Sequence, residues 1–62
     1  MDDARIKSLL EQASERYNEG AYAEAIALWQ EALHGDPSNQ KAREGIRMAS
    51  LLVSSEIGRA HV

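Results

Sequence analysis

Apolar residues recur at intervals of three and four along the first third of the chain. That spacing places them on one side of a helix and predicts a helix from Asp3 to about Glu19. Asp2 and Asp3 suit the positive end of the helix dipole, and Gly20 is predicted to end the helix because glycine readily adopts a left-handed backbone. The stripe comprises Ile6, Leu9, Leu10, Ala13 and Tyr17.

A second stretch, from about Tyr22 to His34, repeats this pattern. Gly35 is predicted to stop the second helix, and the pair Asp36-Pro37 prevents its continuation. Because only about two residues separate the two helices, they are expected to run antiparallel as an αα-hairpin. The second stripe comprises Tyr22, Ala25, Ile26, Trp29, Ala32 and Leu33.

A third helix is predicted from Ser38 or Asn39 to Ser55 or beyond. One helix packed on one hairpin needs a single apolar face, yet this segment carries two. The second face therefore requires an explanation of its own. The first face comprises Ala42, Ile46, Ala49, Val53 and Ile57, and the second Met48, Leu51 and Leu52.

The stretch "NEGAYAEAIALWQEALHGDP" resembles a tetratricopeptide repeat. That family repeats a helix-turn-helix about every 34 residues, with an alanine, an aromatic residue four positions later and a proline after the second helix. The order and spacing of Ala25, Trp29, Ala32 and Pro37 match this pattern. The resemblance covers residues 6–39, and Gly20, Tyr22, Leu9, Ala13 and Tyr17 also fit it.

Small side chains explain the pattern physically, because two helices approach closely only where side chains are small. Ala13, Ala25 and Ala32 would provide that closeness, and Trp29 would fill the space between the hairpin and the next helix. The chain departs from the family pattern at Leu9, where tryptophan is frequent, and at Arg47, where a small residue is expected.

Arg47 would hinder close packing of a further helix, so the third helix is expected to be a capping helix. The fold prediction is therefore all-α, an antiparallel tetratricopeptide hairpin followed by a C-terminal capping helix. Residues 1–57 form the domain, with the repeat at 6–39 and the capping helix at about 39–57. Residues 58–62 are expected to be a frayed tail.

Composition narrows the classes of function. The chain has 62 residues, no cysteine and a net charge of −3. A negative chain is poorly suited to nucleic acid, and its apolar runs are far shorter than the about 20 residues of a membrane span. The acidic start lacks the apolar core of a signal peptide, so a cytoplasmic protein is expected. One repeat is rarely stable alone, which suggests self-association or a domain of a longer protein.

First helices of successive repeats line a concave groove in the tetratricopeptide family. The resemblance therefore implies that two sets of residues bind a partner, which would be another protein or peptide. From the first helix these are Lys7, Leu10, Ser14, Tyr17 and Asn18. From the third segment they are Lys41, Glu44, Met48, Leu51 and Leu52. The apolar members would form a strip for an amphipathic helix or an apolar peptide.

Three interpretations remain open. The first is a non-catalytic adaptor, scaffold or assembly module. The second is a homo-oligomerisation module that pairs with its own copy, by its apolar face or by exchange of the third helix. The third is a small helical ligand-binding bundle or enzyme, for which no convergent polar pocket is apparent. Some family members grip a C-terminal carboxylate in this groove, but Leu10, Ser14 and Glu44 occupy the corresponding places.

Catalytic chemistry is not indicated. The carboxylates are dispersed along outward faces, and no glycine-rich loop precedes a helix. His34 falls in the last turn of the second helix, where a basic residue suits the helix dipole. His34 and His61, far apart and without cysteine, do not resemble a zinc site. No catalytic residue, metal ligand or cofactor is therefore predicted.

Overall fold

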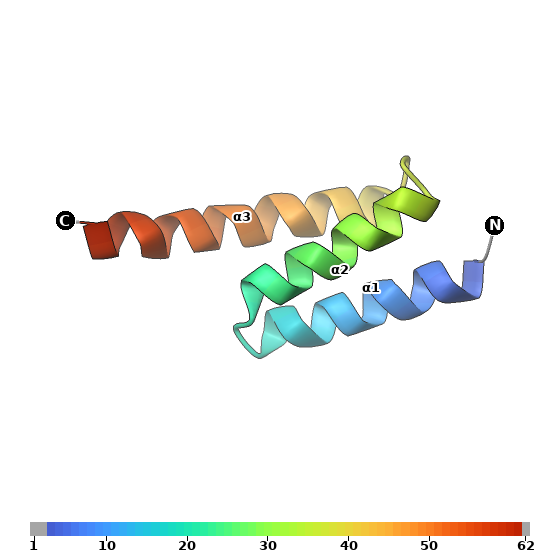
Figure 1. The fold of residues 1–62 in the computed structure, drawn as a ribbon, viewed down its shortest axis with the longest axis horizontal. Helices are drawn as coiled ribbons and strands as arrows, with labels where there is room; N and C mark the ends of the chain where they lie inside the picture. The colour runs from blue at the N-terminus through green and yellow to red at the C-terminus, as the bar shows by residue number, and fades with distance from the viewer. Residues whose placement is uncertain (1–2, 62) are drawn as a thin grey trace.

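The computed structural model describes the backbone of residues 3–61 and the side chains of residues 3–53. Within this part the chain forms three helices, α1 at Asp3–Asn18, α2 at Tyr22–Gly35 and α3 at Gln40–His61 (Figure 1). No strand occurs among the described residues. The predicted all-α fold is confirmed.

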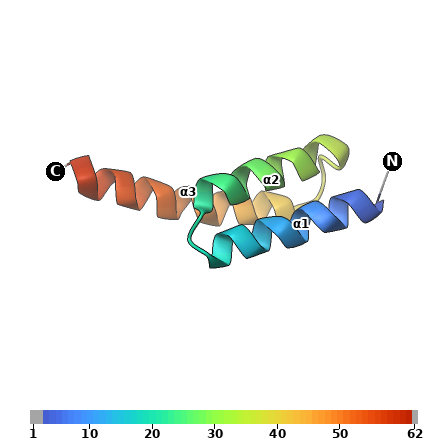
Figure 2. The same ribbon diagram turned by 60° about the horizontal axis from the view of Figure 1, so that its bottom comes forward.

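Helix α2 lies between the other two helices (Figure 1). It is antiparallel to α1 and to α3, and both pack against it, whereas α1 and α3 barely touch each other. With 22 residues against 14, α3 is longer than α2, and its C-terminal part extends past the hairpin (Figure 2). Two parallel helices are thus held apart by a third that lies between them.

The turn between α1 and α2 follows a defined pattern of backbone hydrogen bonds. The N–H of Gly20 donates to the carbonyl of Tyr17 at 3.0 Å, and the N–H of Ala21 donates to the carbonyl of Arg16 at 2.9 Å. This pair is the Schellman motif, which satisfies carbonyls at a helix end and requires a left-handed residue. Gly20 supplies that residue, with φ of +86°. The predicted stop at Gly20 is confirmed.

We expect Gly20→Ala to lower the free energy of unfolding by about 1 kcal/mol, because a Cβ is strained at positive φ. No atom lies within 4 Å of the position that this Cβ would occupy, so the cost is purely conformational. Urea titration followed by circular dichroism measures the loss. Asn tolerates the left-handed region better, so Gly20→Asn is the control and should lose less. Equal losses in both variants would contradict this explanation.

Gly35 lies at the end of α2, where the stop was predicted, although its backbone is not left-handed. It is the last residue of the helix, and the only described residue with positive φ is Gly20. A Cβ at Gly35 would lie 2.6 Å from Cδ1 of Ile6. The glycine therefore allows α1 to approach the end of α2 closely. The helix ends because Pro37 follows in the connecting turn.

Residues 36–39 form the turn between α2 and α3, and several side-chain hydrogen bonds lie within this turn and at the start of α3. Asp36 accepts hydrogen bonds from Ser38 Oγ at 3.0 Å and from Asn39 Nδ2 at 3.4 Å. The Oδ1 atom of Asn39 accepts from the N–H of Ala42 at 2.9 Å. Asn39 is thus the N-cap of α3, which satisfies one of the free N–H groups in the first turn of the helix.

The core is small and consists mostly of alanine. Leu9 and Trp29 are its only large members among the described residues, and none of its side chains is polar. The buried set is Leu9, Ala13, Ala25, Trp29, Ala32, Ala42 and Ala49. The predicted close approach at Ala13, Ala25 and Ala32 is confirmed, because all three have no exposed surface.

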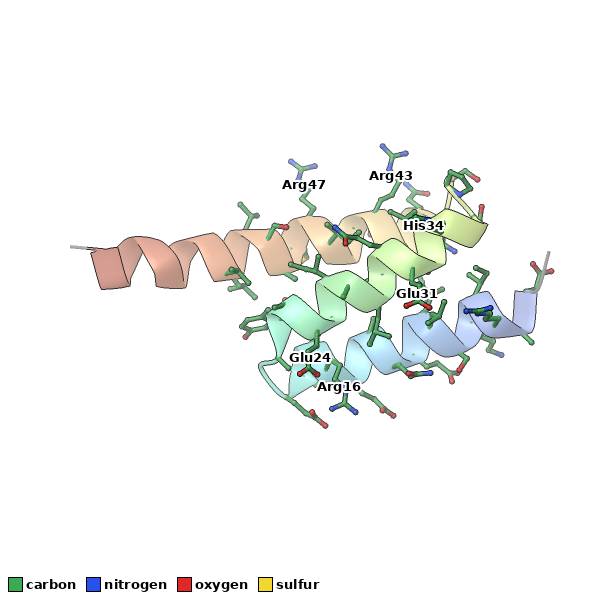
Figure 3. All side chains as sticks on the ribbon, viewed as in Figure 1. Arg16, Glu24, Glu31, His34, Arg43 and Arg47 are labelled. Atoms are coloured by element: carbon green, nitrogen blue, oxygen red, sulfur yellow. The ribbon has the colours of Figure 1, made fainter. Side chains whose placement is uncertain are left out.

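The small residue that brings α3 against the hairpin is Gly45. A Cβ there would lie 2.6 Å from Cζ2 and 2.7 Å from Cδ2 of Trp29. Arg47, where the repeat pattern has a small residue that would face a further helix, is exposed and projects from the edge of α3 away from α2 (Figure 3). The packing surface of α3 runs instead along Ala42, Gly45 and Ala49, at helical spacings of three and four.

Two other sequence predictions concern the end of the chain. Helix α3 continues to His61, past the boundary expected near residue 57. Gly58 is the one residue in that stretch with a low helix propensity, and a single glycine does not break a helix. The side chain of Ile57, expected on the packing stripe, lies outside the described residues, as does Val62.

Candidate functional site

A hollow of about 560 Å³ lies between α1 and α3. Trp29 of α2 forms part of its lining, since α2 is the helix that spaces the two walls. The lining residues are Lys7, Leu10, Glu11, Ser14, Glu15, Trp29 and Lys41. Four of the residues predicted to bind a partner are among them: Lys7, Leu10, Ser14 and Lys41.

A second hollow of about 220 Å³ adjoins the first, and both are lined by Trp29 and Lys41. Its other walls come from the end of α1 and the middle of α3. The lining residues are Tyr17, Trp29, Lys41, Glu44, Gly45 and Met48. The two hollows together are termed the α1–α3 groove. It brings together seven of the ten residues predicted to bind a partner.

Leu51 and Leu52, two of the remaining three, continue the groove face of α3 beyond the hollows. Residues 41, 44, 48 and 52 share one side of the helix, because their spacing is three or four. Met48, Leu51 and Leu52 are 56%, 65% and 38% exposed, respectively. The expectation that these three lie off the core is confirmed. Asn18, also expected beside the groove, is exposed and lines neither hollow.

Aromatic packing fixes the floor of the groove. The ring of Tyr17 lies 5.9 Å from that of Trp29 and 5.3 Å from that of Tyr22, with an edge-on geometry in the second pair. Both arrangements are favourable for aromatic pairs. The indole is only 6% exposed, so most of the ring that forms the floor is packed inside the core.

Charged side chains lie along the rim of the groove, with lysines toward one end and glutamates further along. Lys7 and Lys41 lie near the N-terminal ends of α1 and α3, which run in the same direction (Figure 1). Glu11, Glu15 and Glu44 follow further along the same helices. The ion pairs found in residues 3–53 are Arg5–Glu31 at 3.6 Å and Arg16–Glu19 at 3.0 Å, both away from the groove. The two groove lysines are therefore available to a partner.

The sequence interpretation omitted four residues of the groove. Trp29 was omitted because it was assigned to the core alone. Gly45 was omitted because its neighbour belongs to another helix, which local spacing does not reveal. Glu11 and Glu15 could have been found, since Lys7, Glu11 and Ser14 form one helical row at spacings of four and three. The outward-facing pattern of Glu11 and Glu15 predicts only a solvated surface.

A third hollow, of about 460 Å³, lies between α1 and α2. Its lining residues are Arg5, Ile6, Leu9, Glu31, His34 and Gly35. The Arg5–Glu31 ion pair satisfies its charges, and Figure 3 shows Glu31 on the side of α2 that faces α1. Large exposed apolar side chains lie beside the α1–α3 groove and not here. The α1–α3 groove is therefore the stronger candidate.

No group of three or more histidine, cysteine, aspartate or glutamate residues in the described part of the chain could hold a metal ion. His34 lies in the last turn of α2, as predicted. Within the same residues, no helix combines the length and the apolar character needed to cross a membrane.

The fold and the groove define a class, a three-helix all-α domain with a groove between its outer helices. Comparisons of the sequence with protein-family models, with curated proteins and with solved structures found no match.

Proposed function

We propose that this chain is a non-catalytic protein–protein interaction module of the tetratricopeptide type, with an adaptor, scaffold or assembly role in the cytoplasm. The observation that carries the proposal is the apolar face of α3. Met48, Leu51 and Leu52 are large apolar side chains exposed beside a groove whose floor is an indole. Exposed apolar clusters of this kind mark interaction sites.

The chemistry of the groove favours a segment of protein as its occupant. Leu10, Tyr17 and Met48 offer apolar contact, while Lys7 and Lys41 offer charges at the rim. A polar rim around an apolar centre is the usual composition of a protein interface. Small-molecule sites are instead concave and enclosed with convergent polar groups, whereas these hollows are open and share one continuous face.

We expect Met48→Glu to abolish capture of partner proteins from a lysate of the source cells, because the carboxylate would place a charge in the apolar part of the groove. Quantitative mass spectrometry of proteins retained by the immobilised chain measures this. Ser50→Glu, an exposed change on the other side of α3, is the matched control and should retain every partner. A protein set that is the same for the two variants would show that the groove is not the binding site.

A further inference from the structure

We propose that the partner seated on the groove is a second copy of this chain, in a two-fold dimer with α3 antiparallel to α3. This inference rests on the proposed function, because it names the occupant of the same groove. The face of α3 that borders the groove carries Lys41, Glu44, Met48, Leu51 and Leu52, and its two halves differ. Toward the N-terminus this face borders two hollows, and toward the C-terminus it carries the exposed Leu51 and Leu52.

A face of this kind is complementary to itself. In a two-fold interface, residue i of one copy contacts residue j of the other, and j contacts i. If the axis passes beside Met48, Leu52 of each copy lies level with Glu44 of the other. Leu52 then enters the smaller hollow of its neighbour, between Tyr17 and Met48. The apolar half of each face covers the hollow half of the other.

The weakness of the single-chain core supports a second copy as the occupant. Only Leu9 and Trp29 are large among its buried residues, and no large side chain is completely enclosed in the described part. Small domains often gain the missing stability by association. A second copy of the chain is a partner that is present at the same concentration as the chain itself. The length of α3 adds to this, because its C-terminal part has no helix of the hairpin beside it (Figure 2).

The available surface limits the size of the contact. A standard interface buries about 800 Å² from each partner, which is roughly one sixth of the 4662 Å² that this chain exposes. The α3 face from Lys41 to Leu52 is only about 17 Å long at 1.5 Å per residue. The contact is therefore at the small end of the range, and we expect a dissociation constant of about 100 μM.

Sedimentation velocity over a concentration series measures the association. We expect a monomer at about 10 μM and mostly dimer at about 1 mM, and at least a tenfold weaker dimer for Leu52→Glu. Ser50→Glu should dimerise as the parent chain does. A strict monomer at the highest concentration would overturn self-pairing, while groove-dependent capture of other proteins would keep the proposed function intact.

Disulfide trapping tests the arrangement, since the natural chain has no cysteine. Met48→Cys should form a linked dimer in a glutathione buffer, because the residue lies beside its own copy at the axis. A mixture of Glu44→Cys and Leu52→Cys should give mainly the mixed disulfide, and Ser50→Cys should give none. A dimer that links through Ser50→Cys, or that Leu52→Glu leaves unchanged, would overturn this geometry. If Met48→Glu also left every captured protein unchanged, the proposed function would fail as well.

Discussion

Replacing Trp29 with alanine is expected to unfold the chain at 25 °C. The indole is 6% exposed and contacts all three helices, with Tyr17 of α1 on one side and Gly45 of α3 on another. Truncation of a buried tryptophan costs about 3–5 kcal/mol. A single hydrophobic core in a domain of this size rarely supplies more than about 3–5 kcal/mol. The loss is therefore comparable with the whole stability.

Circular dichroism at 222 nm across a thermal melt measures this effect. The control is Leu28→Ala, which removes a half-buried side chain from the same helix but leaves the indole in place. We expect the control to remain folded, with a cost of about 1–2 kcal/mol from its smaller loss of apolar burial. If the two variants melt at the same temperature, the indole is not the centre of the fold.

The helices were predictable because their signals are local. Apolar spacing of three and four marks the buried side of each helix, and Gly20 marks the first turn through its need for a left-handed backbone. The αα-hairpin follows from the short connection, because a loop of so few residues requires the two helices to run antiparallel. These features depend only on residues that are close in sequence.

The packing roles of the glycines at helix contacts could not be predicted in this way. Gly35 and Gly45 lie inside helices, where a glycine in the sequence alone suggests an end or a weak point. Each is explained by a side chain on another helix, Ile6 for the first and Trp29 for the second. Such a contact depends on the angle at which two helices cross, and that angle is set jointly by residues throughout both surfaces.

The groove was predicted in part, for a related reason. Seven of its residues were named because the repeat resemblance places α1 and α3 on one side of the domain. Its floor was not named, since Trp29 was assigned wholly to the core. A large ring can belong both to the core and to the floor of the groove. It fills the contact between helices, and one of its edges lies at the surface between α1 and α3.

Gly45→Ala should destabilise the chain, although glycine is a poor helix former. Alanine in the interior of a helix normally gains about 0.5–1 kcal/mol over glycine. At this position the new Cβ would overlap the indole of Trp29, lying 2.6 Å from Cζ2 and 2.7 Å from Cδ2. A rigid ring cannot bend away, so α3 must move from α2. Overpacking of this kind costs about 1–3 kcal/mol, and we expect a net loss of about 1–2 kcal/mol.

A double-mutant cycle with Trp29→Phe isolates the cause of that loss. The phenyl ring is smaller than the indole and leaves room for a methyl group, so Gly45→Ala should cost less in this background than in the parent. Residues in direct contact show coupling of about 0.5–3 kcal/mol in such cycles. Urea unfolding of the parent, the two single variants and the double variant measures the coupling energy. Strict additivity would mean that Gly45 acts through the helix backbone alone, and that the approach of α3 to the hairpin is set by Ala42 and Ala49 without it.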